Sequence, residues 1–236
     1  MNMSMKRIQA IFIKDYKEFS RNYAVSTIIL MPIILAFFYG RSNFELMQIY
    51  FLPINMTFSM VTTFIHCCLI AEEKESNTLR SLMMSPASIA DILIGKSALV
   101  FSITAVILAL SIYLVGYEPA NIVVLALALA VSTVFYLALG TVCGLYTKTA
   151  MEASLAVLPV MVVFSLGPFV LSLSETYPIL SVAEWLPSAQ LILLAESLQV
   201  AAPAKELIVP FVVMIAWSVV AILVTTVLYK KRMTDD

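Results

Sequence analysis

Charged residues are scarce in this sequence. Asp, Glu, Lys and Arg together make up 12% of its 236 residues, whereas hydrophobic residues make up 61%. Ordinary soluble domains carry roughly 25% charged residues, so this composition excludes a soluble fold and indicates a chain embedded in a membrane. The length leaves room for about six helices, because a helix needs about 20 apolar residues to cross a bilayer.

Cysteine and histidine are also rare, and neither sign of charge is in clear excess. The formal net charge is −1, which provides no basic field, so no nucleic-acid partner is predicted. Cys67, Cys68 and Cys143 lie in apolar segments and are odd in number, so no disulfide framework is expected. His66 precedes two adjacent cysteines whose side chains point to different helix faces, and we predict no metal site there.

Motifs for ATP binding and for intramembrane catalysis are missing. Gly95-Lys96-Ser97 resembles the end of a phosphate-binding loop, but the earlier glycine that this loop requires is replaced by Ala90. The sequence also lacks His-Glu-x-x-His and Gly-x-Ser-x-Gly. We therefore predict a chain without catalytic residues or a cofactor of its own, and we expect Lys96 to extend to the cytoplasmic interface.

Six apolar runs have the length that a bilayer requires. They cover residues 24–40, 50–70, 89–115, 121–146, 150–173 and 207–229. Residues 174–205 hold prolines and aromatics around an apolar run that is too short to cross, and we interpret them as re-entrant or outer helices, with a surface loop as the alternative. The sequence thus predicts an all-α polytopic membrane protein, with residues 1–236 in a single transmembrane domain.

Residues 5–23 have the pattern of a basic amphipathic helix. Apolar residues recur at helical spacing from Ile8 to Phe19, and basic residues occupy the other faces. We favour an interface helix lying on the anionic surface of the lipid bilayer over a solvated helix end. With this end inside the cell, every Lys and Arg except Arg41 and Lys205 falls on the cytoplasmic side. This asymmetry predicts six transmembrane helices with both the N- and C-termini cytoplasmic.

Small and kinking residues mark two of the predicted spans. Gly140-x-x-x-Gly144 places two glycines on one face of the fourth span, where we expect them to permit close helix packing. Pro159 and Gly167-Pro168 are expected to kink the fifth span, either passively or as a hinge.

The most charged stretch after the N-terminal helix is the segment 71–86, whose sequence is AEEKESNTLRSLMMSP. A charged residue costs about 2.5 kcal/mol or more at the bilayer centre, so this segment is a cytoplasmic loop between the second and third spans. Leu79, Leu82 and Met83 share one side of a short helix that Pro86 ends. The segment is either a solvated connector or a docking helix for a partner protein.

The run from Glu72 to Leu79, followed by Leu82 and Ser85-Pro86, resembles the E-x-E-x-G-T-L-x-x-L-x-x-(S/T)-P segment of the type-2 ABC (ATP-binding cassette) exporter permeases. Asn77 stands where the family more often has Gly, and both residues tolerate a left-handed turn. The order of helices resembles this family along essentially the whole chain. The resemblance implies a coupling helix in the loop 72–86 and location in the cell membrane of a bacterium. It also implies two partners, an ABC ATPase subunit dimer that binds ATP and Mg and a second permease subunit, identical or related.

The resemblance further implies two groups of functional residues. Apolar contacts and a charged rim of the coupling helix would dock on the ATPase through Glu72, Glu73, Glu75, Thr78, Leu79, Arg80, Leu82 and Met83. A translocation pathway between the first, second and fifth spans would be lined by Phe37, Phe38, Phe58, His66 and Phe164. Such an aromatic, uncharged lining predicts export of a hydrophobic or amphipathic cargo, such as a drug, an antimicrobial peptide or a lipid-like molecule. The alternative is that these aromatics face lipid.

Two other functions stay open on the sequence. An ion-coupled secondary transporter needs ionisable groups near the bilayer midplane, whereas Glu45, Asp91, Glu118 and Glu152 all fall at span ends. The second is a non-transporting immunity or scaffold protein with the same fold.

Overall fold

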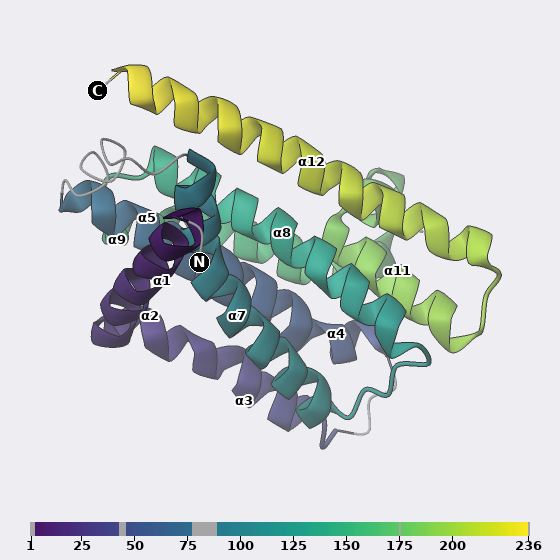
Figure 1. The fold of residues 1–236 in the computed structure, drawn as a ribbon. Coiled ribbons are helices and arrows are strands. Elements are labelled where there is room, and N and C mark those ends of the chain that lie inside the picture. The colour runs from purple at the N-terminus through teal and green to yellow at the C-terminus, as the bar shows by residue number, and fades with distance from the viewer. Residues whose placement is uncertain (1–2, 43–45, 77–88, 175, 236) are drawn as a thin grey trace.

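The computed structural model describes residues 3–42, 46–76, 89–174 and 176–235 (Figure 1). Within these residues the regular elements are helical. The α-helices are α1 (Met3–Arg21), α2 (Tyr23–Ser26), α3 (Leu30–Tyr39), α4 (Met47–Met56), α5 (Ile65–Glu75), α7 (Ile89–Val115), α8 (Ile122–Tyr146), α9 (Ala150–Met161), α10 (Gly167–Val170), α11 (Pro187–Gln199) and α12 (Ala204–Asp235). Short 3-10 helices cover Thr27–Ile29, Leu171–Leu173 and Pro178–Trp185, and π-helical segments cover Thr57–Phe64 and Val162–Leu166.

Several of these helices are long and apolar enough to cross a membrane. The described residues contain five such helices, or up to seven if each of two bent pairs forms one span. The prediction of an all-α polytopic membrane protein is therefore confirmed. The first bent pair joins Met5–Arg21 to Tyr23–Tyr39 at 89°, so the chain turns sharply where the sequence predicts the interface helix to meet the first span.

The second bent pair lies in the segment between the fifth and sixth predicted spans. The 3-10 helix Pro178–Trp185 meets α11 at 80°, and Pro187 starts α11, where its missing N–H costs nothing. Most of α11 is buried, and it packs against α12, α8 and α4. The segment thus contains a packed helix, α11, preceded by the 3-10 helix Pro178–Trp185, which has no buried residue.

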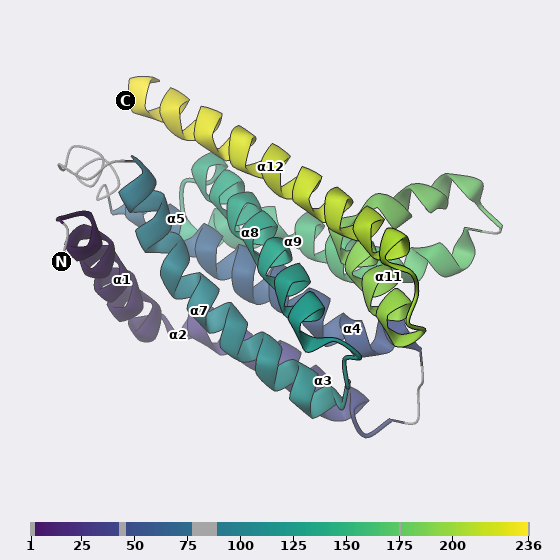
Figure 2. The same ribbon diagram turned by 45° about the vertical axis from the view of Figure 1, so that its right-hand side comes forward.

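The centre of the bundle is the continuous helical run Met47–Glu75, which consists of α4, a π-helical segment and α5. About its axis lie α3, α7, α8 and α9 (Figures 1 and 2). In its most apolar window 89% of the run is buried, against 17% for α12. Its polar residues explain this placement, because Asn55, Thr62 and His66 are tolerated at membrane depth only inside the bundle.

The helix α8 approaches this central run at its two glycines. A Cβ atom added to Gly140 would lie 2.8 Å from the carbonyl oxygen of Thr63, and one added to Gly144 would lie 2.8 Å from Cβ of Ile70. Both distances are shorter than ordinary contacts of a Cβ atom. Hydrogen in place of a side chain is therefore what lets the two backbones come together here.

Both ends of the described chain lie at one end of the bundle. The start of α1, the end of α5, the start of α7 and the end of α12 lie at this end in both views (Figures 1 and 2). It also holds Lys14, Asp15, Glu73 and Lys96, and it is termed the charged end. Placement of both termini at one end agrees with an even number of crossings.

Candidate functional site

A buried ion pair joins α5 to α7 at the charged end. The Nζ atom of Lys96 lies 2.5 Å from Oε2 of Glu73 and 3.9 Å from Oδ2 of Asp15, and all three side chains are at most 1% exposed. An uncompensated charge at this depth costs several kcal/mol, so the two carboxylates are what allow Lys96 to stay buried. The expectation that Lys96 extends to the interface is therefore wrong.

Lys14 of α1 completes this cluster. Its ammonium group pairs with Glu73 and lies 3.2 Å from Oδ1 of Asp15 and 3.3 Å from Oε2 of Glu18. The carboxylates of Asp15, Glu18 and Glu73 bring oxygen atoms within 4.8 Å of one another, and the ammonium groups of Lys14 and Lys96 pair with them and offset two of the three negative charges. The cluster is a set of ion pairs that fastens α1 to α5 and α7.

Burial and ion pairing shift the pKa values of Lys14 and Asp15, the α1 side chains of this cluster. Burial raises the pKa of Asp15 above its ordinary value, although Lys96 and Lys14 oppose the shift. Burial alone would lower the pKa of Lys14, but Glu73, Asp15 and Glu18 together raise it. A raised pKa in the folded state means that the protonated form contributes stability that is lost as the pH rises through that pKa. For Asp15 the raised pKa means that burial disfavours the ionised carboxylate, and Lys96 and Lys14 offset part of that cost.

The last turn of α5 also binds the ends of two other helices. The Nζ atom of Lys74 donates to the carbonyl oxygens of Leu145, at 2.7 Å, and Thr147, at the C-terminal end of α8. Glu75 accepts a hydrogen bond of 3.2 Å from the backbone N–H of Ala150 at the start of α9. A cation at a helix C-terminus and an anion at an N-terminus both complement the helix dipole. Lys74 and Glu75 thus fasten the junction of α8 and α9 to the end of α5.

These contacts bear on the residues predicted to dock on an ATPase. Residues 72–75, assigned to the loop from the sequence, form the last turn of α5. Glu73 is buried in the ion-pair cluster and not on an exposed rim, Glu72 accepts a hydrogen bond from the side chain of Asn22, and Glu75 is exposed. The other members of the predicted set lie outside the described residues; they are Thr78, Leu79, Arg80, Leu82 and Met83.

The aromatic residues predicted to line a pathway fall into two groups. The rings of Phe58 and Tyr136 stack at 5.0 Å between centroids, and Phe164 meets Tyr136 edge-on at 5.6 Å. Phe37 and Phe38 instead lie exposed near the end of α3, at 42% and 65%. The contact of Tyr136 with Phe58 and Phe164 was not predicted, although the adjacent aromatic residues Phe135 and Tyr136 are visible in the sequence.

His66 lies between α5 and α8 and is fully buried. Its Nε2 atom is 3.0 Å from the hydroxyl oxygen of Thr141, and that hydroxyl donates at 3.0 Å to the carbonyl oxygen of Leu137. Because a hydroxyl has a single proton, Thr141 must accept from Nε2–H of His66. The histidine therefore links two helices inside the bundle.

A known protein family matches most of this chain. Residues 43–227 match the model of a family described as ABC-2 family transporter protein. The chain belongs to this ABC-2 transporter family. It is a multi-pass membrane protein and the permease component of an ABC transporter. A comparison with curated proteins found no match.

Two π-helical segments meet inside the permease. The hydroxyl oxygens of Ser59, in Thr57–Phe64, and Ser165, in Val162–Leu166, lie 2.6 Å apart. Pro53 and Pro159 each precede one of these segments by about one turn. Proline has no N–H to donate, so it interrupts the regular hydrogen-bond ladder, and π-helical turns often occur at functional sites. The fifth span is irregular at its predicted kink, and its irregular part contacts that of the central run.

We expect the substitutions Ser59→Ala and Ser165→Ala to be energetically coupled by about 0.6 kcal/mol, the typical value for hydrogen bonds between membrane helices. Each substitution removes one half of the same bond, so the double variant should lose less than the sum of the two. Unfolding of the purified permease, followed for all four members of the cycle, measures this. As a control, Ser59→Ala and Thr104→Val should be additive, since Thr104 bonds to Thr62 instead. Additive losses for the serine pair would show that the bond is not formed.

Proposed function

We propose that the permease is the membrane subunit of an ATP-driven exporter and that the coupling loop 72–86 docks on a separate ATPase subunit dimer through its part beyond α5. The attachment of this part of the loop to the core supports the proposal. It follows α5, which continues the most buried helical run and whose last turn is held by Asn22, Lys14, Lys96 and the ends of α8 and α9. A displacement of this part of the loop would therefore reach the whole bundle. The absence of an ATP-binding motif from the sequence explains the need for a partner.

The cargo that we propose is hydrophobic or amphipathic. Phe37 and Phe38 expose a large aromatic surface near the end of α3, with the guanidinium of Arg41 3.6 Å from the ring centroid of Phe37. A cation over an aromatic ring is a favourable contact, and together they offer an apolar surface with one positive edge. We further propose that a second permease subunit, identical or related, faces this surface, and that the assembly lies in the plasma membrane of a bacterium.

The docking proposal is tested by substituting the apolar ridge of the loop. Leu79→Asp with Leu82→Asp should lower co-purification with a candidate ATPase, and the ATP turnover of the complex, by about tenfold or more, because an unpaired charge in an apolar cleft costs over 1.4 kcal/mol. Ser81→Asp lies off the ridge and serves as the matched control. Unchanged association and turnover in the double variant, with normal elution on size exclusion, would refute the docking assignment.

Vesicles reconstituted with the permease and the candidate ATPase test the direction of transport and the cargo. Accumulation of an apolar fluorescent compound on the side away from the ATPase is expected, with a lower rate for Phe38→Ala than for Tyr113→Ala, which is a comparably exposed aromatic on α7. Transport that requires an ion gradient and not ATP would favour the ion-coupled alternative. ATPase binding without transport of any tested compound would favour a scaffold role.

A further inference from the structure

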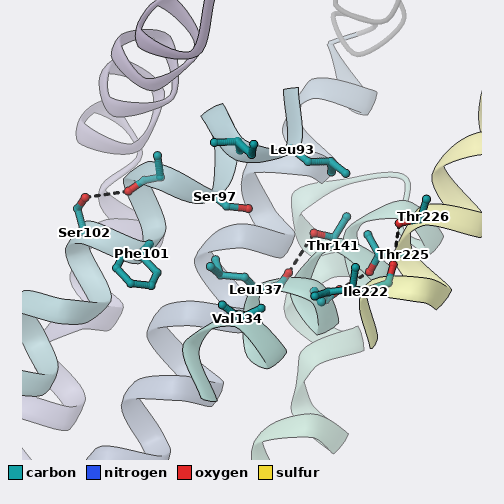
Figure 3. A pocket seen from close by; sticks show the side chains of 13 residues that line it. Leu93, Ser97, Phe101, Ser102, Val134, Leu137, Thr141, Ile222, Thr225 and Thr226 are labelled. Carbon is teal, nitrogen blue, oxygen red and sulfur yellow. Dashed lines mark hydrogen bonds between the residues drawn. The ribbon is translucent and has the colours of Figure 1, made fainter. Parts of the chain in front are cut away.

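An apolar groove opens on the side of the bundle between α7 and α12 (Figure 3). Its volume is about 510 Å³, within the roughly 300–1,000 Å³ typical of ligand pockets. Both α7 and α12 pack against α8, so α8 forms the floor of the groove. The floor is buried at Leu137, Ala138 and Thr141.

The rim shows that the groove opens sideways into the bilayer. Ile94 is 55% exposed, Phe101 39%, Val134 38% and Ile222 44%, and all four line the groove. They belong to α7, α8 and α12, each of which is long and apolar enough to span a membrane. The medium at the mouth of the groove is therefore hydrocarbon and not water.

Four of the five hydroxyl groups that line the groove donate to backbone carbonyls, the exception being Ser97. Thr141 donates to Leu137 at 3.0 Å, Thr225 to Ala138 at 3.1 Å, and Thr226 to Ile222 at 2.8 Å. Figure 3 shows such bonds among the residues that line the groove, and the bond of Thr225 joins α12 to α8. A water molecule in a cavity needs two to four polar partners, and these four hydroxyl groups already donate their protons to the backbone. The groove thus offers few hydrogen bonds and suits an apolar occupant.

A second apolar concavity continues the first along α7 and α8. It has a volume of about 390 Å³ and lies between α7 and α8, reaching Pro119 and Ile122 at the far end from the charged end. Phe101 lines both concavities, so its side chain lies where the two meet. A flexible chain can bend around this ring, whereas a rigid helix from another subunit would have to displace it.

We propose that an acyl chain of a membrane phospholipid is a resident ligand of this groove. The chain matches the lateral opening, the apolar lining and the elongated, divided shape. Close packing of the chain against the floor replaces contacts that an empty concavity would forfeit. The site lies on α7, α8 and α12, apart from the spans proposed to line the transport pathway, and its occupation does not depend on the ATPase.

The experiment uses the full-length permease alone, extracted from vesicles of phosphatidylethanolamine and phosphatidylglycerol and then delipidated in detergent. Native mass spectrometry should find phospholipid retained on the wild type. Ala98→Phe fills the groove from α7 and should reduce the retained lipid by about tenfold, because burial of roughly two or more methylene groups is lost. Ala216→Phe adds the same bulk to an exposed position of α12 outside the groove and should leave retention unchanged.

A labelling measurement on the wild type covers the case in which Ala98→Phe does not fold. A phospholipid with a diazirine on its acyl chain should label residues 93–102 and 222–226 more heavily than the exposed positions 215–217, 219 and 220 of α12. No retained lipid on the wild type, equal retention in both variants, or equal labelling of the two regions would overturn the proposal. So would loss of a dimer mass in Ala98→Phe, which would identify a second subunit as the occupant.

Discussion

Replacing Glu73 with Gln should lower the free energy of unfolding of the permease by about 3–5 kcal/mol, the usual cost of removing one partner from a buried ion pair. Glu73 is the nearest carboxylate to Lys96 and also pairs with Lys14. Without it, Asp15 is the one carboxylate of the described residues left to pair with Lys96, and its nearest oxygen is 3.9 Å away. The change leaves a charged ammonium group 1% exposed with too little compensation. Thermal and denaturant unfolding of the purified permease measures the loss.

The double variant Glu73→Gln with Lys96→Met distinguishes pairing from a general packing defect. It removes both charges and keeps similar volumes, so most of the lost stability should return. As a control, Lys17→Met removes an exposed charge one turn after Lys14 on α1 and should change the free energy of unfolding by no more than about 0.5 kcal/mol. Losses that simply add in the double variant would show that Glu73 and Lys96 do not stabilise each other.

A single methyl group at Gly140 should destabilise the permease by a net amount of about 1–3 kcal/mol. Alanine favours a helix over glycine by about 1 kcal/mol, so an open site would show a gain instead. Here the new Cβ would lie 2.8 Å from the carbonyl oxygen of Thr63 and 3.1 Å from Cβ of His66. The Thr63 oxygen belongs to the backbone and cannot rotate away, so α8 must move from the central run.

The control for Gly140→Ala is Val123→Ile, which also adds one methyl group to α8 but at a position 64% exposed. Its stability should match the wild type. Gly144→Ala should behave like Gly140→Ala, because its Cβ would meet Ile70 at 2.8 Å and the carbonyl oxygen of Cys67 at 3.0 Å. Equal or higher stability of the Gly140→Ala variant would mean that α8 and the central run are not in close contact in the membrane.

Local features of the sequence were sufficient for much of the fold. Apolar length predicted the helices, and the glycine pair and the prolines of the fifth span marked the places where α8 packs closely and the helix becomes irregular. The same reasoning placed Glu73 on an exposed rim and Lys96 at the interface. A charged side chain near a span end is ordinarily solvated, and no nearby feature of the sequence indicates that it has a buried partner. Lys14 and Glu73 are 59 residues apart in the chain.

The scarcity of charge excluded a soluble fold, and it also made the one charged loop between the spans stand out, whose motif points to the ABC-2 family. Both conclusions could be drawn from the sequence because hydropathy and charge are properties of short stretches of chain. Three other features depended on packing: the ion-pair cluster at the charged end, the contact between the two π-helical segments, and the lateral groove. Each needs side chains or surfaces from different helices to meet in space. Their positions follow from how α1, α7, α8 and α12 surround the central run, and this arrangement arises only when the helices bury one another.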